Sequence, residues 1–310
     1  MCFLSGMKEL ILTSIAAAAD FLLPRICLVC GCRLNIRERH LCLECLTEMP
    51  LTYFWQQTRN PMADRFNDLM QQSIGERKER YAYAAVLFIF RQDAPYRKIT
   101  YQIKYHGDIA AGRHFGKMLG ERLAGCAHFS DVDLIIPVPL HWSRRLKRGY
   151  NQAEAIAEGL ASAMGVPVRT DLLVRKRKTA TQTRLSLEEK ATNVKGAFEV
   201  AAEKVQSLMQ VGTAMGSGAG VRAGVGVGAA MGSGAGVGTG VGVGTGVGVG
   251  TGAGIGARAG ARGGAPAHVL LVDDVFTTGN TLYACFRALR SVFPSGVRIS
   301  VATLGFVGGG

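Results

Sequence analysis

The spacing of hydrophobic residues along this chain changes repeatedly between a strand-like and a helix-like pattern. Short apolar runs rich in β-branched and aromatic residues are typical of strands. They lie at residues 81–90, 132–136, 172–174, 197–200 and 269–272. Helical periodicity fills the intervals, with two stretches in residues 95–125 and another at 151–164. Strands that alternate with helices in this way predict an α/β fold with a mainly parallel sheet and crossover helices.

Two segments depart from this pattern. Residues 51–80 are polar and aromatic, and we expect them to form a connector. Residues 210–265 consist largely of Val-Gly, Thr-Gly and Ala-Gly dipeptides, which provide almost no apolar area to bury. We therefore expect a disordered, low-complexity insertion there. The alternative is a glycine-rich phosphate loop, but such loops are short and open onto a helix. The strands before and after the insertion should be consecutive elements of one sheet. Replacing the insertion with a short linker should therefore preserve the melting temperature and ligand binding.

The remaining parts are an N-terminal module, residues 1–50, and an α/β domain, residues 81–310. The apolar stretch at residues 10–23 looks like the hydrophobic region of a signal peptide, but Asp20 interrupts it and its flank is neutral. A packed amphipathic helix is the better interpretation. Outside the glycine tract, the later sequence has no run of the roughly 20 apolar residues that a membrane span needs. A cytoplasmic protein is therefore expected.

The net charge narrows the class of partner. The chain has 310 residues and a formal charge of +13, from 36 lysines and arginines against 23 acidic residues. Such a field favours an anionic partner. A polyphosphate substrate, a nucleic acid or a ribosome would each satisfy it, so charge alone does not choose among them.

Four cysteines form two closely spaced pairs. Cys27 and Cys30 make one C-x2-C pair, and Cys42 and Cys45 make another eleven residues later. Two such knuckles complete a tetrahedral zinc site, and four thiolates leave no open coordination position. We therefore predict a structural zinc in a small module. No zinc ligand lies in the loops discussed below, so ligand binding there is expected to survive loss of the metal.

Two neighbouring side chains leave alternatives open at this site. Cys32 could substitute for Cys30 or remain a free thiol. His40 is close enough in sequence to compete as a ligand, although we expect a surface histidine. A redox dithiol is the competing interpretation of the paired cysteines, and two pairs at finger spacing argue against it.

The most specific chemistry lies in residues 269–281. Four apolar residues precede Asp273 and Asp274, and a loop rich in hydroxyls and glycine then opens a helix near Thr281. Ligands of open α/β sheets bind at the carboxyl ends of strands, and helix N-termini bind phosphate. Paired acids beside a phosphate cradle suit a sugar phosphate and indicate phosphoribosyl pyrophosphate. The alternative is a solvated acidic turn before an ordinary helix.

Two basic segments could assist such a site. Pro137 and Pro139 stiffen the loop after a strand, and four cations follow that could grip pyrophosphate oxygens. These cations are Arg144, Arg145, Lys147 and Arg148. The alternative is a basic surface turn. The basic, threonine-rich residues 175–184 suit a mobile lid, a solvated face or a nucleic-acid contact.

Together, these motifs resemble the ComF family of bacterial phosphoribosyltransferase-like proteins. In chain order they are the cysteine knuckles, Lys-Tyr-His-Gly-Asp at 104–108, Pro-Val-Pro-Leu-His at 137–141, Arg-Gly-Tyr-Asn-Gln at 148–152, Gln182 with Asn-Val-Lys-Gly-Ala-Phe at 193–198, and the Asp-Asp loop. The glycine tract is not a feature of that family, and Cys32 adds a thiol to the usual four.

The resemblance implies a type I phosphoribosyltransferase core with a zinc module and a link to DNA uptake in natural competence. In such a core, Asp273 and Asp274 hold the ribose hydroxyls, and Mg²⁺ bridges these hydroxyls and the pyrophosphate. The other implied ligand contacts are Thr277, Thr278, Gly279, Asn280, Thr281, Lys104, Pro139, Arg144, Arg145 and Arg148. No motif identifies an acceptor. The alternative is a non-catalytic accessory that binds single-stranded DNA or a competence helicase, because a fold does not prove catalysis.

Overall fold

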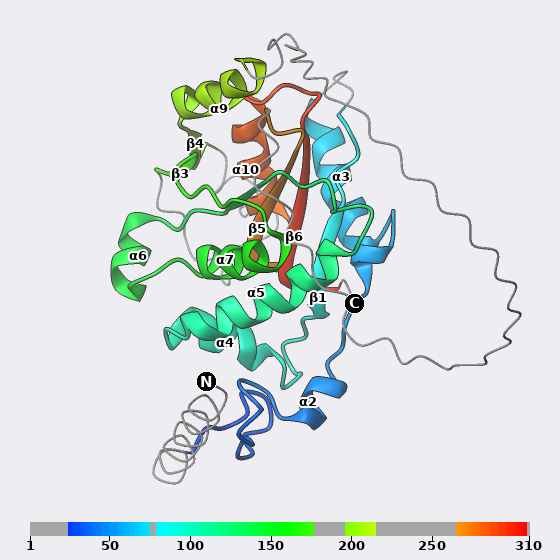
Figure 1. The fold of residues 1–310 in the computed structure, drawn as a ribbon, viewed down its shortest axis with the longest axis vertical. Helices are drawn as coiled ribbons and strands as arrows, with labels where there is room; N and C mark the ends of the chain where they lie inside the picture. Colours follow the sequence, from blue (N-terminus) through cyan, green and yellow to red (C-terminus); the bar gives the residue numbers. More distant parts are fainter. Residues whose placement is uncertain (1–23, 75–78, 177–195, 215–264, 309–310) are drawn as a thin grey trace, which may run out of the picture.

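A four-stranded parallel sheet forms the centre of the protein (Figure 1). The computed structural model describes residues 24–74, 79–176, 196–214 and 265–308. In spatial order, the strands are β1 (Ala84–Ile89), β6 (Arg298–Phe306), β5 (His268–Phe276) and β2 (Leu134–Pro137). All three neighbouring pairs are parallel. The predicted α/β fold with a mainly parallel sheet is confirmed.

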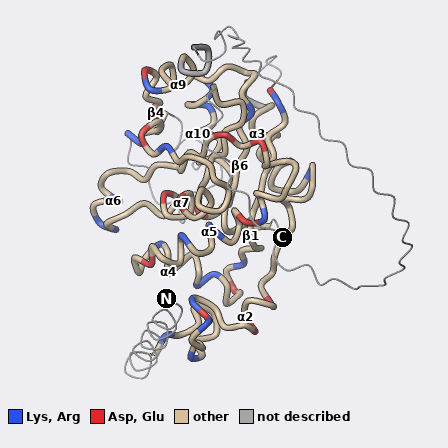
Figure 2. The backbone as a smooth tube through the Cα atoms, in the orientation of Figure 1, with Lys and Arg blue, Asp and Glu red and all other residues tan. Residues whose placement is uncertain are grey.

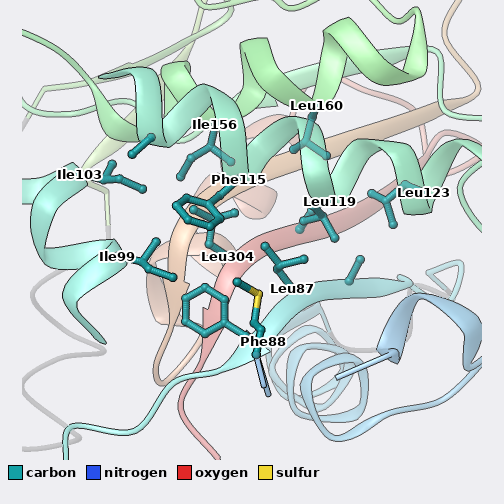
Figure 3. Packing of buried hydrophobic residues seen from close by; sticks show 14 of the residues in the cluster. Leu87, Phe88, Ile99, Ile103, Phe115, Leu119, Leu123, Ile156, Leu160 and Leu304 are labelled. Carbon is teal, nitrogen blue, oxygen red and sulfur yellow. The ribbon is translucent and has the colours of Figure 1, made fainter. Parts of the chain in front are cut away.

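Helices cover both faces of this sheet. One face carries α4 (Arg97–Tyr105), α5 (Ile109–Ala124) and α7 (Gln152–Met164), and the other carries α3 (Pro61–Ile74) and α10 (Asn280–Arg290). Leu270 and Val272 of β5 pack into the first core, while Val269 and Leu271 pack into the second. A strand buried on both faces explains the continuous apolar run in the sequence. Figure 3 shows the first core, in which Phe115 lies among side chains of α4, α7 and the sheet.

Helices α5 and α7 pack unusually closely because glycines face the opposite backbone. A Cβ atom at Gly116 or at Gly159 would lie 2.2 Å from a carbonyl oxygen of the facing helix. Gly112 and Gly120 continue the row one turn to either side. Only glycine permits so close an approach of two backbones. The four-residue spacing of these glycines is a sequence signal of close helix packing that the predictions above did not include.

A separate two-stranded sheet corrects one sequence prediction. Strand β3 (Leu173–Arg175) pairs antiparallel with β4 (Phe198–Val200), and α9 (Ala202–Ala214) follows. The strands before and after the glycine tract therefore belong to different sheets, and the prediction of consecutive elements in one sheet is wrong. The apolar pattern marks strands of three residues, but it does not show which partner each strand pairs with.

The segment expected to be a connector contains α3. Met62 and Phe66 of this helix are fully buried in the second core, so residues 51–80 do more than connect. The short helices η1 (Phe54–Gln56) and α2 (Leu43–Thr47) precede α3, and α6 (Trp142–Arg148) follows β2.

Several predictions concern residues outside the described ranges. They are the N-terminal helix, the segment 177–195 that includes most of the proposed lid, and residues 215–264 of the glycine tract. Within the described ranges, every helix is too short or too polar to span a membrane.

Candidate functional site

The two acidic residues lie where β5 extends beyond its neighbour β2. Pairing of β5 with β2 runs from Val269 to Val272, whereas pairing with β6 continues to Phe276. Asp273 and Asp274 therefore belong to the last part of the strand. The sequence had suggested that the strand ends before them. This position is the carboxyl edge of a parallel sheet, where ligands of such folds bind.

Lys104 reaches the acids from α4. Its Nζ lies 3.0 Å from Oδ2 of Asp274, and the two side chains are 28% and 13% exposed. Burial alone would lower the pKa of Lys104, but the carboxylates of Asp274 and Asp273 together raise it above its ordinary value. The predicted site residues Lys104, Asp273 and Asp274 are thus brought together from distant parts of the chain.

Asp273 has an unusual protonation equilibrium. Burial and then the neighbouring charge of Asp274 raise its pKa to about 7. The backbone N–H of Asp274 donates to Oδ1 of Asp273 at 2.9 Å, and this bond, with the charges of Lys104 and Arg175, opposes the increase. A carboxyl group with such a pKa can gain or lose its proton near neutral pH.

The predicted phosphate loop leads directly into α10. Gly279 has φ 81° and precedes the first helical residue, Asn280, one residue earlier than predicted. A Cβ at Gly279 would lie 2.6 Å from the ring of Phe276, so glycine is required there. Nη1 of Arg65, on α3, donates to the carbonyl oxygen of Thr277 at 3.1 Å. Backbone N–H groups in the first turn of a helix are the kind of donor that binds phosphate.

The basic segment with Arg144, Arg145, Lys147 and Arg148 is a helix instead of the predicted loop. After Pro137 ends β2, a short loop with the half-buried Pro139 leads to α6. His141 starts this helix, with Nδ1 accepting from the Ser143 N–H at 3.3 Å, and Gly149 ends it at φ 80°. The helix holds its cations in fixed directions, so they do not all face one ligand.

The cations of this segment have different surroundings. Arg145 pairs with Glu154 of α7 at 3.0 Å, and the guanidinium of Arg148 lies 5.3 Å from the centre of the Tyr105 ring. Burial and the charge of Arg148 lower the pKa of Arg144. Arg145 is therefore tied to α7, and Arg148 is tied to the residue next to Lys104.

Two residues that our sequence analysis did not assign to the site also lie near the acids. Arg175 of β3 is buried, and its charge lowers the pKa of Asp273. The Tyr150 hydroxyl is buried without a hydrogen-bond partner among the described residues. Burial raises the pKa of Tyr150 to about 12. The charge of Arg148 lowers this pKa, whereas the charges of Asp108 and Asp274 raise it. Tyr150 belongs to the 148–152 motif, and Arg175 is the first residue of the basic segment 175–184.

The cysteine module has geometry suited to a metal. The Sγ atoms of Cys27, Cys30, Cys32 and Cys42 all lie within 4.8 Å of one another. Those of Cys30 and Cys42 are 3.7 Å apart. A tetrahedron with zinc–sulfur bonds of about 2.3 Å has edges of about 3.8 Å, so the spacing fits zinc. This four-thiol group could hold a structural metal such as zinc.

The identity of the fourth thiol stays open between two cysteines. The group of mutually close thiols includes Cys32, whereas Cys45 was expected. Cys45 nevertheless adjoins the group, because its backbone N–H lies 3.5 Å from Sγ of Cys42. Burial, followed by hydrogen bonds with Cys30, Cys42 and Cys27, raises the pKa of the Cys45 thiol. Cys32 and Cys45 are thus both candidates for the fourth position around the same three thiols.

His40 is partly buried, with 17% of its side chain exposed, and does not lie freely on the surface as the sequence suggested. Its ring centre lies 4.9 Å from that of His114 and 6.1 Å from that of Phe115, both on α5. Its Nδ1 is 3.9 Å from Oδ2 of Asp108. The module packs against α5 at this point, which explains the burial.

Comparison with known proteins found relatives named for competence and DNA utilization. No protein-family model matches the chain. Competence protein F of Haemophilus influenzae is 25% identical over 177 residues, 56% of this chain and 70% of that protein. DNA utilization protein YhgH of Salmonella typhi and of Salmonella typhimurium is 41% identical over 69 residues, 22% of this chain and 30% of each relative. These similarities support the resemblance to the ComF family that the sequence motifs indicate.

Two of the sequence motifs have clear structural roles beside the acids. In the 104–108 motif, Gly107 adopts φ 71° and Oδ1 of Asp108 accepts from the Ala111 N–H at 2.8 Å, which caps α5. In the 148–152 motif, Nδ2 of Asn151 donates to the carbonyl oxygen of Val138 at 3.0 Å. These contacts set the course of the chain on either side of the acidic edge.

Proposed function

We propose that this chain binds phosphoribosyl pyrophosphate with Mg²⁺ as a type I phosphoribosyltransferase-like protein, and that it acts in DNA uptake during natural competence. The observation that carries the proposal is the position of Asp273 and Asp274 at the carboxyl edge of the sheet, directly before a glycine-initiated helix. This arrangement supplies hydroxyl acceptors and a phosphate cradle within one continuous segment. The competence role is proposed from the similarity to competence protein F.

The surroundings of the acids suit a polyanionic ligand. Lys104, Arg144 and Arg175 provide positive charge on three different elements. The Tyr150 hydroxyl, which is buried without a partner among the described residues, can donate to a ligand oxygen. An unpartnered buried hydroxyl costs free energy unless a ligand or water satisfies it. We propose that the ligand does so.

In the proposed reaction, the bond from the ribose C1 atom to the pyrophosphate oxygen breaks, and an acceptor bonds to C1. The carboxylates of Asp273 and Asp274 would stabilise the positive charge that develops on the ribose. Lys104 must release Asp274 in part when the ribose hydroxyls bind, and its charge then lies near the pyrophosphate. When bound, Mg²⁺ would neutralise pyrophosphate charge. The acceptor remains open in this proposal.

Calorimetric titration with phosphoribosyl pyrophosphate and Mg²⁺ tests the proposal. We expect saturable heat with the natural sequence and markedly weaker binding by Asp273→Asn. Asp93→Asn is the matched control, because Asp93 is exposed and pairs with Arg91. Because burial and Asp274 raise the pKa of Asp273 to about 7, affinity should increase with pH through that value as the carboxylate forms. Absence of heat with the natural sequence would exclude the proposal.

A second function is favoured by an aromatic–basic surface on α4 and α6. Its residues are Tyr101, Tyr105, Trp142, Arg145, Lys147 and Arg148. The three rings are 53%, 61% and 69% exposed in that order. Figure 2 shows lysine and arginine positions gathered at the outer end of α6. Exposed rings beside cations suit single-stranded DNA, whose bases stack on the rings while its phosphates meet the charges. We therefore propose single-stranded DNA instead of a helicase for this surface.

Fluorescence anisotropy with a labelled oligothymidine tests this second function. Binding should weaken steeply with salt, and Trp142→Ala and Tyr105→Ala should each weaken it. Lys147→Gln should reduce the slope of log affinity against log salt by about one unit. Lys117→Gln on α5 should leave the slope unchanged, since Lys117 lies near Glu121 outside this surface. Failure to bind at low salt would exclude this role without affecting the first proposal.

A further inference from the structure

Helix α4 connects the cysteine module to the acidic edge. At its start, the Tyr96 hydroxyl donates to the carbonyl oxygen of Cys45 at 2.8 Å, and Nζ of Lys98 donates to the carbonyl oxygen of Val29 at 2.7 Å. At its end, Lys104 reaches Asp274. One short helix therefore contacts the module with its first turn and the acids with its last.

Each of the two cysteine knuckles receives one of these bonds. Val29 lies between Cys27 and Cys30 in the first knuckle, and Cys45 closes the second. Val29 and Cys45 are themselves buried in the core that contains α4. Figure 1 shows α4 lying between the module, around α2, and the rest of the protein. A metal that holds both knuckles would thus also fix both acceptors of the α4 bonds.

Because α4 is short, its position depends on such contacts. The helix has nine residues, and isolated helices shorter than roughly 12–15 residues are marginal in water. At a rise of 1.5 Å per residue, about 9 Å separates Lys98 from Lys104 along the axis. A small rotation at the first turn therefore displaces the Lys104 ammonium relative to Asp274.

We propose that the metal-bound knuckles position Lys104 against Asp274 through Tyr96 and Lys98. Tyr96 and Lys98 are positioning residues, because neither contacts the acids. When the metal is removed, the knuckles loosen, α4 loses its two anchors and Lys104 separates from Asp274. This inference concerns Lys104 of the proposed ligand site, and it revises our expectation that events at the module leave that site unchanged.

A competing explanation assigns the position of α4 to apolar packing alone. Ile99 and Ile103 are almost completely buried in the core that also contains Phe115, as Figure 3 shows. If this packing suffices, loss of the two hydrogen bonds or of the metal would leave Lys104 in place. The two explanations therefore predict opposite results for one measurable quantity, the accessibility of the Lys104 amine.

Acylation of lysines with an amine-reactive ester, read by mass spectrometry, measures that accessibility without any substrate. A hydrogen bond biases an equilibrium by about five-fold, so Tyr96→Phe should raise the fraction of free Lys104, and its labelling rate, by about that factor. The double variant with Lys98→Met should raise it further. Tyr101→Phe is the matched control, because Tyr101 lies on the same helix and its ring is 53% exposed. Lys117→Met controls for loss of a lysine.

Metal analysis of the same samples completes the test. We expect the single Tyr96→Phe variant to retain its zinc and still label faster at Lys104, and chelation of the natural sequence to give the same increase. If the double variant also loses zinc, the result supports the inference, since coupling between two sites is reciprocal. Unchanged Lys104 labelling after chelation, or in zinc-containing Tyr96→Phe, would overturn it. Because no ligand is added, failure to bind phosphoribosyl pyrophosphate does not affect the outcome.

Discussion

Nζ of Lys104 lies 3.0 Å from Oδ2 of Asp274, and this ion pair joins the end of α4 to the carboxyl edge of β5. Asp273 adjoins the pair, and its pKa is raised to about 7 by burial and by the charge of Asp274. Three charged groups therefore share one largely buried place. Because these charges interact, the free energy of unfolding should respond to pH and to substitution of each group. These effects can be measured without any ligand.

Lys104→Met should destabilise the protein more at high pH than at low pH. The lysine charge lowers the pKa of Asp273, so its removal raises that pKa further and leaves the ionised Asp274 without its partner. We expect a loss of about 1–2 kcal/mol in the free energy of unfolding at about pH 8, and a smaller loss at about pH 5. Denaturant titrations at both pH values measure this difference. Equal losses at the two values would contradict it.

Asp273→Asn should stabilise the protein near neutral pH while weakening ligand binding. The folded protein keeps the Asp273 proton up to about pH 7, whereas an unfolded aspartate releases it near pH 4. Between these values the folded state binds more protons, so stability decreases as pH rises. Asparagine carries no charge and can still accept the Asp274 N–H. Its free energy of unfolding should exceed that of the natural sequence by roughly 1–3 kcal/mol at about pH 8.

The comparison that tests this effect is a pH series of unfolding experiments. The stabilising effect of Asp273→Asn should disappear as the pH falls below about 4, where Asp273 becomes protonated in both folded and unfolded states. A variant that is less stable than the natural sequence at pH 8 would show that the carboxylate makes favourable contacts that outweigh its burial.

Gly116→Ala should destabilise the protein strongly. Its Cβ would meet a backbone carbonyl oxygen of α7 at 2.2 Å, so α5 and α7 must separate. Overpacking costs typically 1–3 kcal/mol, and we expect about the upper end because the opposing atom belongs to the backbone. Gly125→Ala is the control, since no heavy atom lies within 4 Å of a Cβ built there. Similar melting temperatures for the two variants would contradict the close packing.

Serine substitutions can identify the fourth thiol of the metal site. Cys27→Ser should lose the metal, because Cys27 belongs to both possible sets and structural zinc binding is coupled to folding. Of Cys32→Ser and Cys45→Ser, only the variant that removes a ligand should lose zinc at equilibrium with a competing chelator. Both remain candidates, because Cys32 lies in the group of mutually close thiols and Cys45 hydrogen-bonds to members of that group. Retention of zinc by Cys32→Ser and its loss from Cys45→Ser would restore the pairing predicted from sequence.

Local patterns were sufficient to locate most elements and the acidic motif. The helix of α7 and the two helices α4 and α5 follow from apolar periodicity together with capping residues such as Asn151 and Asp108. The sequence was less informative for β3 and β4, because three-residue strands give too short a pattern to indicate their partner. It was also misleading for α6, where prolines suggested a loop but a cap at His141 starts a helix.

The sequence by itself determined the α/β class, the position of Asp273 and Asp274 after a buried apolar run, and the close spacing of the cysteines. All of these depend on residues near one another in the chain. Only the tertiary structure decided that Lys104 meets Asp274, that Arg175 lies near Asp273, and that Tyr96 and Lys98 tie α4 to the cysteine module. These contacts join distant segments, and their geometry depends on the packing of helices on both faces of the sheet. Spacing along a chain does not encode such distances.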